Sequence, residues 1–217
     1  MRSLSNIGIL ITLIALTGFG CAKNEASPAP DTTDDAENFV LLENGAYQAN
    51  TEESVITWSG KKAIMPAHTG KVSINFADLM IEEYQPVAGS VVINMQSITS
   101  DEELVLLEEH LKNDDFFAVE TYPTATFTVT NLGTISPPTS NYVATGIMKI
   151  RDIEKEISFP IKITQEEDGN IRVTGIIIID RTDFDIRYNS SSFFENLGDA
   201  LIENNFTLTL DLLFEKM

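Results

Sequence analysis

The sequence predicts an all-β protein, an antiparallel eight-stranded β-barrel in one domain with two short helical inserts. Three observations lead to this prediction. Several segments alternate apolar and polar residues with a period of two, which is typical of strands with one buried and one wet face. Turn-forming residues separate these segments. Only two segments have a helical pattern, and closing the sheet on itself removes its exposed edges.

The first element, residues 1–20, has the pattern of a secretory signal peptide. Arg2 is its only charged residue, and its apolar run is shorter than the roughly 20 residues that cross a bilayer. Cys21, the only cysteine of the chain, follows directly. A cysteine at this position indicates lipidation of the new N-terminus after cleavage, which would anchor the chain to a membrane. The alternative is a plain signal peptide that is cleaved nearby.

Residues 21–44 are predicted to be the lipidated cysteine and a flexible tether. Pro, Ser, Thr and Asp dominate residues 22 to 38, and no large apolar residue occurs among them. Such a composition buries too little surface to offset the entropy of ordering. Residues 45–217 then form the single folded domain. One cysteine excludes an intramolecular disulfide, so the domain depends on its core.

The charge of the chain bounds the partners that it can have. The formal net charge is −19, and removal of the signal peptide takes away one arginine and no acid. This much negative charge repels phosphate backbones, which argues against nucleic acid as a partner. It also disfavours an orientation flat on an anionic membrane. Solubility is the simplest role for the acidic surface.

The folded part contains six clear alternating segments. They cover residues 72–76, 126–130, 143–150, 157–163, 171–179 and 206–212. Turns are predicted at Asp168–Asn170 and Pro137–Asn141. The alternation predicts that one set of apolar residues shares the inner side, namely Ile74, Phe76, Phe127, Val129, Ile161, Ile163, Phe206, Leu208 and Leu210. Whether these side chains line a cavity or fill the barrel depends on their packing, which alternation does not determine.

Two segments are predicted to be helical. The first runs from Ser100 to about Phe117, and its Leu104, Leu107 and Leu111 lie on one face at helical spacing. The two phenylalanines at its end, Phe116 and Phe117, are expected to plug the end of the barrel. The second and weaker segment is Ser191–Ile202, which Gly198 interrupts.

Short motifs in a fixed order give the chain a family resemblance. They are WSGKK from Trp58, HTG from His68, GSVVINMQSI from Gly89, HLKNDDFF from His110, ETYPTATF from Glu120, GIMKIR from Gly146, DRTDF from Asp180 and FFENLGD from Phe193. With these motifs the chain resembles the YceI-like family. The resemblance implies a periplasmic, lipocalin-like barrel that binds a polyisoprenoid or a related lipid. The segment from Arg151 to Phe159 departs from the pattern of many relatives, so the ligand can differ from theirs.

No motif predicts catalysis or a metal site. The HLKNDDFF segment offers acids beside His110, but no nucleophile or second histidine lies near it. His68 and His110 are the only histidines, whereas a zinc site takes three or four ligands. We therefore predict no catalytic residue and no metal ligand.

Two arginines are candidates for a ligand head group. Arg181 lies between Asp180 and Asp183, and its guanidinium could bind an anionic group through a forked pair of hydrogen bonds. It could equally form an internal ion pair that fixes the end of a strand. Arg187, beside Tyr188, is a second donor with the same two interpretations.

The sequence thus predicts a lipid-anchored protein on the periplasmic side of a bacterial cell envelope. Its barrel would hold a polyisoprenoid, a quinone or an acyl lipid, and it would be no enzyme. No cofactor is expected apart from that bound lipid, and a homodimer is left open. The alternative is a solidly filled barrel that acts as a stress or interaction protein of the envelope without a lipid ligand.

Overall fold

The computed structural model describes residues 41–135 and 139–217. The predicted signal peptide, Cys21 and residues 22–40 of the tether lie outside the described residues. So does part of the predicted Pro137–Asn141 turn. Within the described ranges, no helix is long and apolar enough to cross a membrane.

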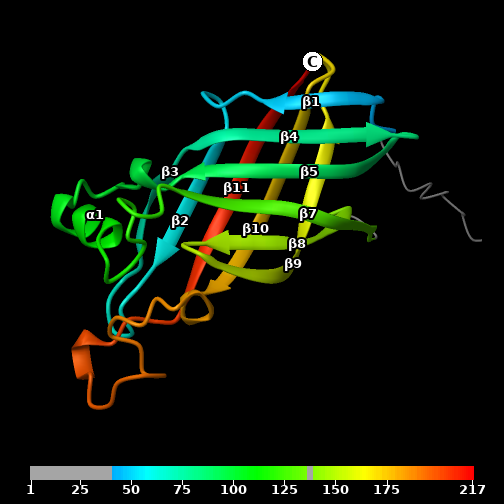
Figure 1. Ribbon diagram of the computed structural model, residues 1–217. Helices are drawn as coiled ribbons and strands as arrows, with labels where there is room; N and C mark the ends of the chain where they lie inside the picture. Colours follow the sequence, from blue (N-terminus) through cyan, green and yellow to red (C-terminus); the bar gives the residue numbers. More distant parts are fainter. Residues whose placement is uncertain (1–40, 136–138) are drawn as a thin grey trace, which may run out of the picture. The chain divides into compact units, whose positions relative to one another are not determined.

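Strands make up most of the described chain (Figure 1). The strands are β1 Gly45–Ala49, β2 Val55–Gly60, β3 His68–Val72, β4 Ile74–Glu82, β5 Gln85–Asn94, β6 Thr99–Ser100, β7 Thr124–Thr134, β8 Tyr142–Ile150, β9 Ile153–Gln165, β10 Ile171–Asp180 and β11 Asn205–Lys216. The helices are α1 Val105–Lys112 and three 3-10 turns, η1 Met95–Ser97, η2 Arg181–Phe184 and η3 Gly198–Ala200.

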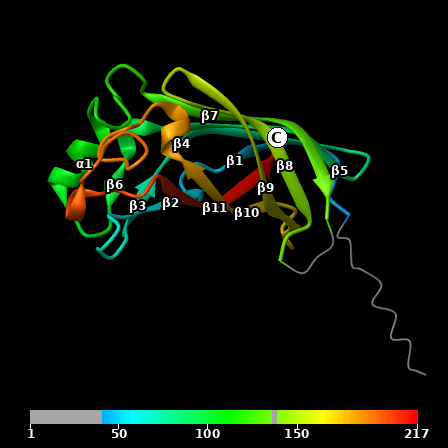
Figure 2. The ribbon, with the colours of Figure 1, turned by 90° about the horizontal axis from the view of Figure 1, so that it is seen from below.

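The strands close into the predicted antiparallel barrel of eight strands (Figures 1 and 2). The order of neighbours is β1-β4-β5-β7-β8-β9-β10-β11, and β1 pairs back with β11 to complete the ring. β2 pairs with an earlier part of β11, and β3 pairs with β2. β1 and β2 are therefore two parts of one interrupted strand, and β3 and β4 are parts of the next.

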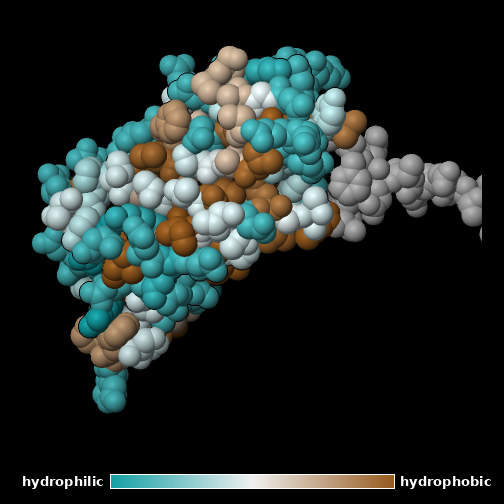
Figure 3. Space-filling model, turned by 45° about the vertical axis from the view of Figure 1, so that its right-hand side comes forward, coloured by the Kyte–Doolittle hydropathy of each residue, from teal (hydrophilic) through white to brown (hydrophobic). Residues whose placement is uncertain are grey.

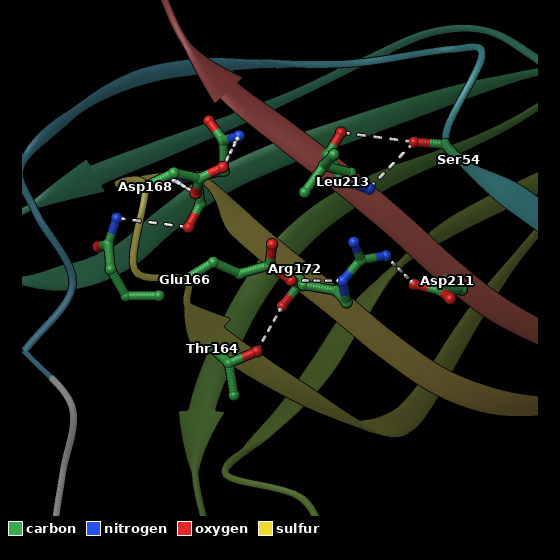
Figure 4. Close-up of polar contacts among 9 residues, drawn as sticks. Ser54, Thr164, Glu166, Asp168, Arg172, Asp211 and Leu213 are labelled. Carbon is green, nitrogen blue, oxygen red and sulfur yellow. Dashed lines mark hydrogen bonds and ion pairs between the residues drawn. The ribbon is translucent and has the colours of Figure 1, made fainter.

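A buried serine bridges the interruption between β1 and β2 (Figure 4). Ser54 accepts a hydrogen bond from the Leu213 backbone N–H at 3.0 Å, and its hydroxyl donates to the Leu213 carbonyl at 3.4 Å. Asn50 also donates its backbone N–H to that carbonyl at 2.8 Å. These bonds satisfy the β11 backbone where the strand pairing is broken, as buried backbone groups require.

An arginine joins β10 to its neighbours at the same end of the barrel (Figure 4). Arg172 contacts Glu166 at 2.5 Å and Asp211 at 2.7 Å. Hydrogen bonds to these carboxylates raise the pKa of the Arg172 guanidinium above its ordinary value. The three side chains are about a third to a half exposed, so their contribution to stability is small.

The helical predictions are right in part. α1 begins at Val105 rather than Ser100, because Ser100 belongs to β6 and Glu103 has a positive φ of 54°. The second predicted helix, Ser191–Ile202, is wrong. Asn196 and Gly198 both have positive φ angles, which an α-helix does not allow, and only η3 forms there.

Most predicted inner-face residues face the interior. Ile74, Phe127, Ile161, Ile163, Leu208 and Leu210 are buried, whereas Val129 and Phe206 are half-buried against the same core. The placement of Phe76 on the inner side is wrong, since its side chain is 39% exposed. A β-bulge between Ile74 and Phe76 adds one residue to β4 and reverses the facing of every residue after it.

Candidate functional site

A cavity of about 500 Å³ opens at one end of the barrel. The α1 helix and the segment between β10 and β11 lie beside each other at this end, at the left in Figures 1 and 2. Most of the wall is apolar. Its inner part includes Val72, Ile93, Met95, Ala125, Met148, Ile150 and Leu208. The barrel is therefore hollow in the half that carries this opening.

The α1 helix forms one side of the cavity. Leu104, Leu107 and Leu111, which the helical spacing placed on one face, all line it. Leu106 lines it as well, although its side chain is 82% exposed. The helix therefore presents leucines both to the cavity and to the solvent at the opening.

An aromatic cluster closes the wall next to α1. The ring of Phe116 lies edge-on to His110 at 5.1 Å between centroids, and His110 lies edge-on to Tyr188 at 4.7 Å. Phe117 contacts Phe206 at 6.2 Å in the same geometry. All of these residues line the cavity. The HLKNDDFF motif thus supplies aromatic wall, and Phe116 and Phe117 line the open cavity rather than plug it.

Arg181 lies in the wall with its guanidinium bound to backbone. The guanidinium donates to the carbonyls of Glu203 at 3.1 Å, Ile186 at 2.9 Å and Ile202 at 3.1 Å. The residue is only 3% exposed, and burial lowers its pKa, which Asp180 partly offsets. The geometry favours the structural interpretation of this residue, because its fork already holds η2 against the segment before β11.

Arg187, the second head-group candidate, lies outside the cavity wall. Its guanidinium pairs with Asp185 at 2.5 Å and stacks on the Phe193 ring at 4.6 Å. Both charged side chains are about half exposed. Sequence proximity to Arg181 therefore did not bring the two arginines to one site.

Polar groups outside the predicted set of pocket residues line the opening. Lys61, Lys62, Glu203 and Asn205 belong to the cavity wall, and Lys61 pairs with Glu203 at 3.1 Å. His68 also lines it and contacts Glu102 at 3.6 Å. A hydrogen bond from Ser100 is the main cause that lowers the pKa of Glu102. A polar head group at the opening would meet both signs of charge.

Trp58, the first residue of the WSGKK motif, also lines the cavity. Its indole N–H donates to the Thr99 carbonyl at 2.9 Å, and its ring lies across Gly70. A Cβ on Gly70 would lie 2.7 Å from that ring and would clash with the Thr99 carbonyl. The absence of a side chain at Gly70 therefore leaves room for the Trp58 ring. In the sequence, these two residues belong to the WSG and HTG motifs.

A smaller cavity of about 70 Å³ lies in the other half of the barrel. The predicted pocket residues divide between the two cavities. Phe116, Phe117, Phe206, Leu208 and Arg181 line the larger one, whereas Phe127, Val129, Ile161, Ile163 and Leu210 line the smaller one. Ile74 is buried but lines neither, and Phe76 and Arg187 lie outside both.

Apolar side chains are also exposed around the opening. Ile64 and Met65 lie on the β2–β3 turn, Val105 begins α1, and Phe193 and Phe194 lie on the β10–β11 segment. Figure 3 shows teal hydrophilic side chains over much of one face, with apolar patches between them and at the protruding lower end. In the described part of the chain, no three His, Cys, Asp or Glu side chains gather as a metal site would require.

Comparison with known proteins identifies a family over most of the domain. The model of the YceI-like domain matches residues 47–214. No curated sequence shows significant similarity to this chain.

Solved structures share the fold at low sequence identity. Burkholderia cenocepacia BcnA is 16% identical, with a TM-score of 0.61 over 76% of this chain and 98% of its own. A polyisoprenoid-binding domain from Saccharophagus degradans, described as implicated in plant cell wall breakdown, is 12% identical, with a TM-score of 0.59 over 81% of this chain and 100% of its own. The Campylobacter jejuni YCEI protein is 22% identical, with a TM-score of 0.51 over 68% and 85%.

Proposed function

The chain belongs to the YceI-like family, and from that premise we propose that its larger cavity binds the hydrocarbon chain of a polyisoprenoid, a quinone or an acyl lipid. The observation that carries the proposal is the cavity itself, which is apolar within and open at one end. Burial of a hydrocarbon contributes roughly 25 cal/mol per Å² of surface removed from water. Such a ligand needs few polar partners beyond the opening.

The polar residues at the opening support a ligand whose hydrocarbon chain lies inside the cavity and whose head group lies at the opening. Lys61, His68 and Glu203 are exposed enough to contact a head group while the chain lies inside. Arg181 contributes through the backbone that it holds, since its hydrogen bonds to Ile186 and Ile202 fix two wall residues. The polyisoprenoid-binding domain of Saccharophagus degradans, which shares the fold, agrees with a ligand of this class.

The proposed setting is the periplasmic side of a bacterial cell envelope. It rests on the signal-like residues 1–20 and on Cys21, which would carry a lipid after cleavage. In this setting the protein carries or stores a lipid that water alone does not dissolve. The role is that of a carrier rather than a catalyst, because the wall is apolar and its histidines contact aromatic rings and carboxylates.

The cavity argues against the alternative of a solidly filled barrel. A barrel that acts only through its surface has no need of a cavity of about 500 Å³, which forfeits packing contacts along its wall. An interaction with another envelope protein remains compatible with the exposed apolar residues around the opening.

The test is native mass spectrometry of the protein purified from bacterial membranes, followed by binding of added prenyl alcohols. We expect a bound lipid in the wild type and its loss in Leu107→Asp, because a charge in an apolar wall is costly. Val105→Asp is the matched control on the same helix, since Val105 is exposed and lines neither of the two cavities described above. An unliganded wild type that takes up no prenyl or acyl chain would contradict the proposal.

A further inference from the structure

We infer that a partition of packed side chains across the barrel limits the length of hydrocarbon that the larger cavity accepts. This inference rests on the proposed function, because it concerns the ligand of the same cavity. The two cavities, of about 500 and about 70 Å³, lie in one barrel and share no wall residue. A layer of side chains therefore separates them.

The partition can be located from residues that are neighbours but face different cavities. Phe127 of β7 and Met148 of β8 are register partners, and both are buried. Met148 lines the larger cavity, whereas Phe127 lines the smaller one. β11 shows the same division. Leu208 lines the larger cavity, and Leu210, two residues further along the strand, lines the smaller one.

Phe127 is held in this layer by a close fit. A Cβ on Gly146 would lie 2.7 Å from Cζ of the Phe127 ring, so the ring occupies the space of the missing side chain. The ring also lies 5.1 Å from that of Phe159 between centroids. Gly146 and Phe159 thus position Phe127 beside Met148, and the partition is part of the barrel's own packing.

The volume in front of the partition defines the ligand class. About 500 Å³ holds roughly 15 to 20 non-hydrogen atoms at ~30 Å³ each. This matches a prenyl chain of about three or four isoprene units, or one acyl chain of common membrane lipids. The further carbons of a longer polyisoprenoid would stay outside the opening, where they gain no burial.

The test compares farnesol, geranylgeraniol and solanesol, with the change in Trp58 fluorescence on binding as the readout. Trp58 is the only tryptophan and lines the larger cavity. We expect wild-type affinity to increase from farnesol to geranylgeraniol and to increase no further with solanesol. In Phe127→Ala the cavities join, and solanesol should bind at least about tenfold more tightly, since each further buried methylene is worth about fourfold.

Phe214→Ala is the matched control. It removes the same ring from the smaller cavity but leaves Phe127 and Met148 in place, so the length preference should not change. If Phe127→Ala does not fold, Phe127→Leu should produce a smaller shift in the same direction.

Two results would overturn the inference alone: wild-type protein that binds solanesol much more tightly than geranylgeraniol, or equal shifts in Phe127→Ala and Phe214→Ala. Failure of the wild type to bind any prenyl alcohol or fatty acid would instead overturn the proposed function, and this inference with it.

Discussion

At the residue scale, Arg181 shows how one side chain can serve a cavity without contacting its ligand. Its guanidinium donates three hydrogen bonds, one to the carbonyl of Ile186, after η2, and two to the carbonyls of Ile202 and Glu203, before β11. A buried guanidinium with carbonyl partners compensates its own desolvation only while those bonds persist. The side chain therefore holds together the two chain segments that form this part of the cavity wall.

Replacement of this side chain should be costly. Arg181→Met removes the donor from one buried carbonyl, that of Ile186, and from two part-buried ones. We expect the free energy of unfolding to fall by about 2–4 kcal/mol. Arg187→Met is the control, because its pair with Asp185 is half exposed and should be worth less than about 1 kcal/mol. Urea denaturation measures both, and equal losses in the two variants would contradict the structural role of Arg181.

Tyr142 predicts how stability depends on alkaline pH. Burial raises the pKa of its hydroxyl, which donates to the side chain of Gln85 at 3.0 Å. In the unfolded chain the group titrates at about pH 10. The unfolded state therefore loses this proton first as the pH rises, and the stabilisation present below pH 10 is lost through the folded pKa.

The measurement is the free energy of unfolding of wild type and Tyr142→Phe between neutral pH and about pH 11. We expect a weaker decline above about pH 10 in the variant. Lys216, whose pKa is raised by its hydrogen bond to Glu43, contributes to the decline in both proteins and cancels in the comparison. Identical slopes would show that Tyr142 does not contribute.

At the scale of elements, the packing of β3 against β2 depends on Gly70, which leaves room for the Trp58 ring. Gly70→Ala would put a Cβ against the Thr99 carbonyl and the Trp58 ring, and it should lower the free energy of unfolding by about 1–3 kcal/mol. The fluorescence of Trp58 should shift as its ring moves. Gly60→Ala is the control, because its nearest neighbour would be Phe206 Cβ at 4.0 Å. A neutral Gly70→Ala would refute this packing.

Alternation predicted the strands well where they are regular. β11 runs without a bulge, and its Leu208 and Leu210 face inward as the period of two requires. The same rule failed in β4, where the bulge after Ile74 reverses the facing of Phe76. A bulge depends on the pairing with β5, which a local pattern does not contain.

The candidate site could be predicted only in part for a related reason. Inward facing does not distinguish cavity wall from filling, and Phe127 and Met148 lie side by side yet face different cavities. The motifs pointed to Phe116 and Phe117, which line the larger cavity. Lys61, Asn205 and Trp58 were missed, because their place in the cavity wall depends on how β2 and β11 pair.

At the scale of the whole molecule, the attachment to a membrane is the prediction that lies outside the described residues. If Cys21 carries the lipid, Cys21→Ala should move the protein from the membrane fraction to the soluble fraction. The folded domain, residues 45–217, should keep its stability, because the substitution lies outside it. Cell fractionation with an antibody measures the distribution. A Cys21→Ala protein that stays in the membrane fraction would contradict the lipoprotein assignment.

The described chain enters the barrel at the end opposite the opening. Glu43 contacts Gln165 and Lys216 there, beside the β9–β10 turn (Figure 1). Glu43 lies 22 residues after Cys21, and a chain of that length can span at most about 75 Å, whereas a barrel strand of 12 residues covers about 40 Å. If Cys21 carries a lipid, this reach exceeds the length of the barrel, so the attachment alone would not fix whether the opening points toward the membrane or away from it.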